Sequence, residues 1–286
     1  MSPGFDQRLA DQVAKANSLL CIGLDPDPAR FPAHLHGLEA RTAIVAFNRA
    51  IVEATQDLVC AYKPNLGFYV AQGIAGVEAL VETRELIPSH IPVILDCKVG
   101  DMNSTAAAYA AGYFGTWNFD AVTANPYQGE DSLAPFLSYP DKGVFILCRT
   151  SNPSSRDLQD IAIQDGEDHL YLRVANRART LQRDYPAHVG LVCGATVPEI
   201  LGRIRAQEPA LPILLPGVGA QDGDLEASLE AGLRGDGTGL LVAPSRSIIY
   251  AGNGPDFAER ARDAADALLQ QINSVRKRRT KSAGLA

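Results

Sequence analysis

The stretch Pro92-Val93-Ile94-Leu95-Asp96-Cys97-Lys98-Val99-Gly100-Asp101 joins an apolar run to a charged end. The apolar run predicts a buried strand. Side chains alternate across a strand, so Asp96 and Lys98 should point the same way, and Asp101 follows past a glycine that lets the chain turn. Charges at the end of a buried strand are costly unless they pair or take part in chemistry. The stretch therefore predicts an active site built on a minus, plus, minus array.

Similar short apolar runs alternate with longer segments of helical spacing along the whole chain. The predicted strands cover residues 19–24, 59–63, 93–98, 121–124, 144–147, 189–193, 213–215 and 239–242. The predicted helices cover residues 42–56, 76–87, 104–113, 130–136, 168–185, 198–207, 224–231 and 255–272. Alternation predicts a parallel sheet, and eight units predict closure into a single (β/α)8 TIM barrel. A doubly wound sheet is the alternative, although it more often stops at five or six strands.

The chain is expected to form one catalytic domain followed by a short tail. The barrel is assigned to residues 1–275, because no domain boundary is evident within them. Residues 276–286 form a basic run that is expected to fray into solvent as a disordered tail. Residues 151–167 are polar and follow the fifth strand, where a long loop is typical of a lid or a disordered segment.

Composition excludes several classes of protein. A formal net charge of −7 argues against a nucleic-acid partner, and the short apolar runs argue against a membrane partner. The N-terminal residues lack the apolar segment of a signal peptide, so a cytoplasmic location is expected. The five cysteines form no C-x-x-C pair and read as small buried hydrophobes. The five histidines do not cluster, so neither a metal site nor a cofactor is predicted.

Polar residues recur where the predicted strands end, which is the catalytic face of an α/β barrel. Asp25 ends the first strand, Lys63-Pro64-Asn65 the second, and Thr150-Ser151 the fifth. Any one of them alone is more typical of a helix cap or turn. Asp25 and Lys63 are harder to explain in that way, since each ends an apolar strand with a full charge. With the array at residues 96–101 they predict an ionic network around one ligand.

A phosphate site is predicted at the loops after the last two strands. Pro216-Gly217-Val218-Gly219-Ala220-Gln221 follows the seventh strand, and Ser245-Arg246 follows the eighth. Barrels often bind phosphate with these two loops. Arg246 could add a charge-assisted contact to the phosphate. The position of the glycine-rich loop favours phosphate binding over a plain turn.

Taken together, these motifs resemble the orotidine 5′-phosphate decarboxylase family, specifically its bacterial long-chain (type 2) branch. The resemblance rests on residues 22–25, 62–65, the D-x-K-x-x-D run with Thr105 behind it, residues 150–153, 216–221 and 245–247, in family order along nearly the whole barrel. The D-x-K-x-x-D run alone is shared with relatives that act on other sugar phosphates. Asp222 stands where a glycine is common in the family.

The resemblance implies cofactor-independent decarboxylation of orotidine 5′-phosphate to uridine 5′-phosphate, a step of pyrimidine biosynthesis. Lys98 would donate the proton and Asp96 would face the substrate carboxylate. The implied roles in substrate binding fall to Asp25 and Lys63 at the ribose hydroxyls, Ser151 at the pyrimidine, Gln221 between base and phosphate, and Arg246 at the phosphate, with Asn65, Thr150, Gly217, Gly219 and Ser245 beside them.

The resemblance also implies a homodimer, in which Asp101 and Thr105 complete the neighbouring subunit's site. Two other functions remain open. One is a magnesium-dependent decarboxylase or aldolase of a sugar phosphate that uses the same D-x-K-x-x-D frame. The other is a non-catalytic sensor of a phosphate ligand, which would need the phosphate loop but not a lysine between two aspartates.

Overall fold

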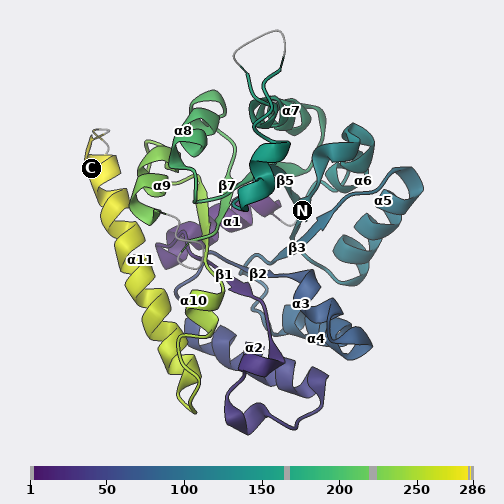
Figure 1. The fold of residues 1–286 in the computed structure, drawn as a ribbon, viewed down its shortest axis with the longest axis vertical. Helices are drawn as coiled ribbons and strands as arrows, with labels where there is room; N and C mark the ends of the chain where they lie inside the picture. Colours follow the sequence, from purple (N-terminus) through teal and green to yellow (C-terminus); the bar gives the residue numbers. More distant parts are fainter. Residues whose placement is uncertain (1–2, 164–167, 219–223, 283, 285–286) are drawn as a thin grey trace.

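Parallel strands form the centre of the molecule (Figure 1). The computed structural model describes residues 3–163, 168–218, 224–282 and 284. Its strands are β1 (Cys21–Leu24), β2 (Ala61–Pro64), β3 (Ile94–Val99), β4 (Ala121–Ala124), β5 (Gly143–Arg149), β6 (His188–Cys193), β7 (Ile213–Pro216) and β8 (Leu240–Ala243). β1 pairs with β2, and β3 to β8 pair in sequence order. Bridges from Leu20 to Val242 and from Tyr62 to Val93 close the ring. The predicted barrel is confirmed.

Most of the helices surround this ring on its outer side, while α1 lies across one end of it (Figure 1). They are α1 (Phe5–Ala16), α2 (Ala40–Thr55), α3 (Leu66–Val70), α4 (Gly73–Leu86), α5 (Asn103–Ala110), α6 (Ala134–Leu137), α7 (Leu170–Asp184), α8 (Pro198–Gln207), α9 (Leu225–Gly232), α10 (Arg246–Ile249) and α11 (Phe257–Ser282). The helix predicted over residues 130–136 is a 3₁₀ turn at Glu130–Ser132 followed by α6. The sequence reasoning missed α1, α3 and α10.

α1 closes the amino-terminal end of the barrel. Its Phe5 and Leu9 join the apolar cluster inside the ring, and the Phe5 ring meets Phe145 edge to face with centroids 5.9 Å apart. Burying such a side chain contributes about 1.5–3 kcal/mol. Gly143 makes the space, because a Cβ there would lie 2.7 Å from the Phe5 ring. The catalytic face must therefore be the opposite, carboxyl end of the strands.

The end of α11 differs from the predicted tail. The helix continues through Ser282, so residues 276–282 are helical where fraying was expected. Arg276 accounts for part of this, because its Nε donates to Gly237 O at 2.9 Å and its Nη1 to Asn273 Oδ1 at 2.7 Å. A run of charges in the sequence does not reveal an acceptor as distant in the chain as Gly237. The last residues, 283 and 285–286, lie outside the described part of the chain.

The segment after β5 contains a short 3₁₀ helix, Pro153–Asp157, within the predicted loop, and residues 164–167 lie outside the described part. Within the described ranges, every helix is too short or too polar to cross a bilayer. The cytoplasmic location stays a prediction.

Candidate active site

A cavity of about 630 Å³ opens at the carboxyl ends of the strands. It collects most of the polar residues that the sequence placed at strand ends. Its lining consists of Asp25, Lys63, Asn65, Phe68, Asp96, Lys98, Thr123, Leu147, Thr150, Ser151, Asn152, Gln159, Val192, Leu214, Pro216, Gly217, Val218, Ala243, Ser245 and Arg246. Charged groups and apolar side chains thus share one concave surface, as expected for a site that binds a small organic anion.

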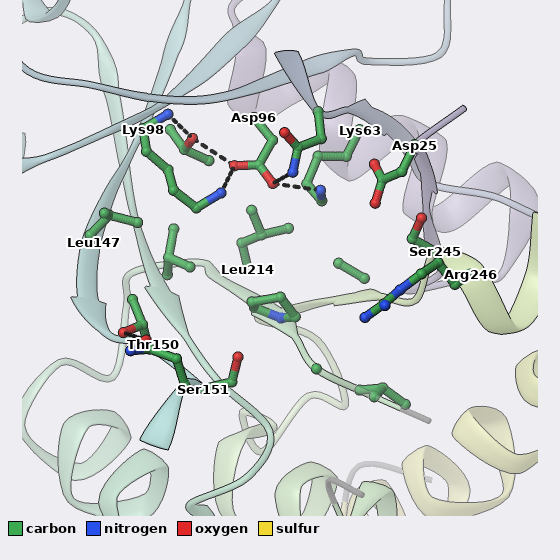
Figure 2. A pocket seen from close by; sticks show the side chains of 18 of the residues that line it. Asp25, Lys63, Asp96, Lys98, Leu147, Thr150, Ser151, Leu214, Ser245 and Arg246 are labelled. Carbon is green, nitrogen blue, oxygen red and sulfur yellow. Dashed lines mark hydrogen bonds and ion pairs between the residues drawn. The ribbon is translucent and has the colours of Figure 1, made fainter. Parts of the chain in front are cut away.

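Asp96 is the centre of the charged wall and lies between two lysines (Figure 2). Lys63 Nζ lies 2.8 Å from Asp96 Oδ2, and Lys98 Nζ lies 2.6 Å from Asp96 Oδ1. The Lys63 side chain is only 5% exposed, whereas that of Lys98 is 48% exposed. Lys98 is therefore the more accessible of the two cations, and Lys63 lines the cavity from a buried position.

In the buried pair of Lys63 and Asp96, each charge keeps the other group ionised. Burial by itself would raise the pKa of Asp96, but the ammonium groups of Lys63 and Lys98 outweigh it and hold the pKa well below its usual range. Burial would likewise lower the pKa of Lys63, but Asp96, followed by Asp25, raises it above the ordinary lysine value. All of this favours an ionised carboxylate between ammonium groups at neutral pH.

The backbone bends at Lys98. Its φ of +48° lies in the left-handed region, and the pairing of β3 with β4 changes register between Leu95 and Val99. The Lys98 N–H donates to Thr123 Oγ1 at 2.9 Å, and Thr123 Oγ1 donates to Asp96 Oδ1 at 3.0 Å. Alternation predicted that Asp96 and Lys98 share a side. They do meet, although across this irregularity and not along a regular strand.

Thr123 was missed by the sequence reasoning. It lies in the apolar run of β4, is 1% exposed, and lines the cavity. The available signal was a hydroxyl inside an otherwise apolar buried strand, since buried polar groups require partners. Gln159 was also missed as a lining residue, because it lies well past the end of β5 in the following loop. Asn152, which belongs to the resemblance over residues 150–153 but was given no role, lines the cavity as well.

Asp25 is buried at the other end of the charged wall. Its Oδ1 accepts no hydrogen bond from the residues that the structure describes. A buried carboxylate oxygen without a donor is costly, so a ligand hydroxyl there would remove a penalty. Ser245 and Arg246 enter the cavity from the same side (Figure 2), and Ser245 Oγ donates to Gly23 O at 3.2 Å. Gly217 has a φ of +92°, which favours glycine at this turn.

Thr150 and Ser151 enter from the opposite side (Figure 2). Gln159 holds Thr150 in both directions: its Oε1 accepts from Thr150 N at 2.8 Å, and its Nε2 donates to Thr150 Oγ1 at 3.0 Å. The carbonyl of Ser151 accepts from Thr196 Oγ1 at 3.3 Å. The Ser151 side chain is thus presented by a loop anchored on several neighbours.

Two residues of the predicted phosphate site, Gly219 and Gln221, lie outside the described residues, as does Asp222. Asp101 and Thr105 are described but do not line the cavity of their own chain. Among the ion pairs of the described residues, none joins Asp101 to Lys98; the Asp101 carboxylate accepts from Met102 N instead, at 2.8 Å. The structure therefore forms the Asp96–Lys98 half of the predicted array but does not add Asp101 to it within one chain.

Comparisons with known proteins agree with this arrangement. The model of the orotidine 5′-phosphate decarboxylase / HUMPS family matches residues 18–261. Orotidine 5′-phosphate decarboxylase of Thermomicrobium roseum is 52% identical over 280 residues, which cover 98% of this chain and 99% of that one. The enzyme of the same name from Azoarcus sp. is 49% identical over 263 residues, which cover 91% and 95% of the two chains.

Solved structures give the same result. OMP decarboxylase of Leishmania donovani superposes with a TM-score of 0.82 at 41% identity, covering 96% of this chain and 99% of that one. UMP synthase of the same organism gives a TM-score of 0.86 at 42% identity over 96% of this chain, which spans 57% of that longer protein. The chain belongs to the orotidine 5′-phosphate decarboxylase / HUMPS family.

Proposed function

We propose that this protein decarboxylates orotidine 5′-phosphate to uridine 5′-phosphate in pyrimidine biosynthesis, without a cofactor and with Lys98 as the proton donor. The observation that carries the proposal is the Lys98 ammonium, half exposed in the cavity and 2.6 Å from Asp96. Close relatives that match nearly the whole chain bear the name of this enzyme. The same relatives make a sensor or a sugar-phosphate enzyme a weaker alternative.

The chemistry requires a fixed cation. When the carbon–carbon bond to the carboxylate breaks, its electron pair stays on the pyrimidine carbon, and carbon dioxide leaves. Lys98 stabilises that negative charge and then transfers an N–H proton to the carbon, after which the neutral amine regains a proton from water. Asp96 faces the departing carboxylate and keeps the ammonium aimed into the cavity.

The remaining lining residues bind different parts of the substrate. Asp25, whose Oδ1 lacks a donor, and Lys63 bind the ribose hydroxyls, with Asn65 beside them. Thr150 and Ser151 bind the pyrimidine edge. The phosphate falls to Gly217, Ser245 and Arg246, together with Gly219 and Gln221 of the loop after β7. Phosphate contacts far from the reacting carbon supply binding energy that orients the base against the charged wall.

A homodimer is part of the proposal, with Asp101 and Thr105 completing the neighbouring site. Exposed apolar side chains lie close to both in the sequence, with Met102 next to Asp101 and Tyr109 on α5 together with Thr105. Val70, Ile74 and Tyr127 are exposed as well. Exposed apolar side chains of this size are common in protein interfaces, which supports the proposed dimer.

The direct test is turnover of orotidine 5′-phosphate by the pure protein, followed by ultraviolet absorbance with a chelator present. We expect full activity, and at least about a thousandfold loss in Lys98→Ala, because that change removes both the cation and the proton donor. Lys15→Ala, an exposed lysine on α1 at the opposite end of the barrel, is the control.

Each alternative has its own outcome. Loss of turnover with the chelator would support the magnesium-dependent sugar-phosphate enzyme. Tight nucleotide binding without any product would support the sensor. Near-normal turnover in a folded Lys98→Ala variant would refute the role of the lysine.

A further inference from the structure

One hydroxyl group connects the backbone of Lys98 to the carboxylate of Asp96. Thr123 Oγ1 accepts from the Lys98 N–H at 2.9 Å and donates to Asp96 Oδ1 at 3.0 Å. A hydroxyl has one proton to donate, and here the carboxylate receives it while a lone pair accepts the amide. Lys98 Nζ reaches the same Oδ1 at 2.6 Å. The hydroxyl thus closes a loop of contacts that begins and ends on Lys98.

Lys98 requires such a partner because its backbone leaves the regular ladder. Few residues other than glycine adopt a φ near its +48°, and the register between β3 and β4 shifts at this point. A bulge leaves the amide of its extra residue outside the ladder, and a partly buried amide without an acceptor is costly. The Thr123 side chain, one strand away on β4, supplies that acceptor.

Thr123 itself has little freedom to move. It is 1% exposed, and its carbonyl accepts from Cys97 Sγ at 3.4 Å. The Asp96 carboxylate that it contacts is equally constrained, since Lys63 Nζ donates a hydrogen bond to Asp96 Oδ2 at 2.8 Å. The Thr123 hydroxyl therefore fixes two points: the backbone position from which the Lys98 side chain extends, and the Asp96 oxygen with which its ammonium pairs.

We propose that Thr123 is a positioning residue for the reaction. It holds Lys98 in its left-handed backbone conformation and fixes the oxygen of Asp96 to which the ammonium pairs, and so aims Nζ at the reacting carbon. The inference rests on the proposed function, because the aim of Nζ matters only if Lys98 delivers the proton. Misplacing a reacting group by about 1 Å can cost about a hundredfold in rate.

Two variants separate the hydroxyl from the shape of the side chain. Thr123→Val keeps the branched shape and removes the hydroxyl, whereas Thr123→Ser keeps the hydroxyl and removes the methyl group. With orotidine 5′-phosphate we expect Thr123→Val to lower kcat by about 10- to 100-fold with little change in KM, and Thr123→Ser to stay near the unchanged protein. Thermal unfolding of both variants verifies that they fold.

A second measurement needs no substrate. Hydrogen exchange of the Lys98 amide, resolved by NMR, should be about fivefold faster in Thr123→Val and unchanged in Thr123→Ser. This readout separates the two proposals: if the unchanged protein does not turn over orotidine 5′-phosphate, the proposed function fails while the contact is still tested.

Three outcomes would overturn the inference. The first is a kcat that falls equally in both variants, because packing and not the hydroxyl would then be responsible. The second is exchange of the Lys98 amide that is unaffected by Thr123→Val. The third is faster exchange with an unchanged kcat, since the contact would then exist without aiming the lysine.

Discussion

Lys63 and Lys98 pair with opposite oxygens of Asp96, so one carboxylate compensates a buried cation and an accessible one at the same time. The pKa of Lys63 is raised, so its pairing stabilises the fold below the ordinary lysine pKa of about 10.4 and is lost only as pH rises through the higher folded value. The pKa of Asp96 is lowered, so its pairing is present above about 3.9 and is lost as pH falls through the lower folded value. Near neutral pH the pair is complete.

Asp96→Asn should change how the stability of the fold depends on pH. Breaking a buried pair costs about 3 kcal/mol in the free energy of unfolding, because the remaining charge stays buried. With residue 96 neutral, the burial of Lys63 is opposed by Asp25 but no longer by Asp96, so the deficit in stability of the variant should shrink as pH rises from about 7 to about 9, towards the ordinary lysine pKa of about 10.4. Denaturant unfolding at the two pH values measures this, with Asp263→Asn on the surface of α11 as the control. A loss independent of pH would contradict the assignment.

At the scale of elements, the end of β6 sets the position of the loop that carries Ser151. A Cβ on Gly194 would lie 2.6 Å from Ser151 Cβ and 2.7 Å from Ser151 N. Gly194→Ala should therefore displace the loop, lower the free energy of unfolding by about 1–3 kcal/mol, and raise KM for orotidine 5′-phosphate by about tenfold. Gly202→Ala is the matched control, since this glycine lies inside α8 and a Cβ there would be 3.6 Å from its nearest neighbour, Ala231 Cβ of α9, and it should stabilise by about 0.5–1 kcal/mol. Equal effects of the two variants would refute the argument.

Elements whose pattern is local were predictable, and elements that depend on distant partners were not. The strands follow from short apolar runs, and their ends place Asp96 and Lys63 correctly in one cavity. α1 also has apolar residues at helical spacing, but its place at the amino-terminal end of the barrel depends on the space left by Gly143, far away in sequence. Thr123 could not be assigned a partner from sequence, because its contacts depend on the register shift between β3 and β4.

For the molecule as a whole, the open question is which site Asp101 serves, because it does not reach the cavity of its own chain. Asp96 and Lys98 meet at the bend that ends β3, but Asp101 lies past the turn and outside its own cavity. Met102, which follows Asp101 directly, is an apolar side chain that is 48% exposed, and such exposure is costly unless another molecule covers it. In a symmetric dimer, a second copy of the chain would bring its Asp101 to the first chain's site, and the first chain's Asp101 would reach the second site in the same way.

Mixing two inactive variants tests that arrangement. In a hybrid dimer of Lys98→Ala and Asp101→Asn, one site receives both lesions and the other receives neither, if Asp101 acts across the interface. Random mixing after dissociation should then restore about one quarter of the unchanged activity, measured with orotidine 5′-phosphate. The control mixes Lys98→Ala with Asp96→Asn, whose lesions lie in the cavity of the same chain, so every hybrid site keeps one lesion and activity stays absent. Recovery in neither mixture would show that Asp101 acts within its own subunit, because no native site would have formed.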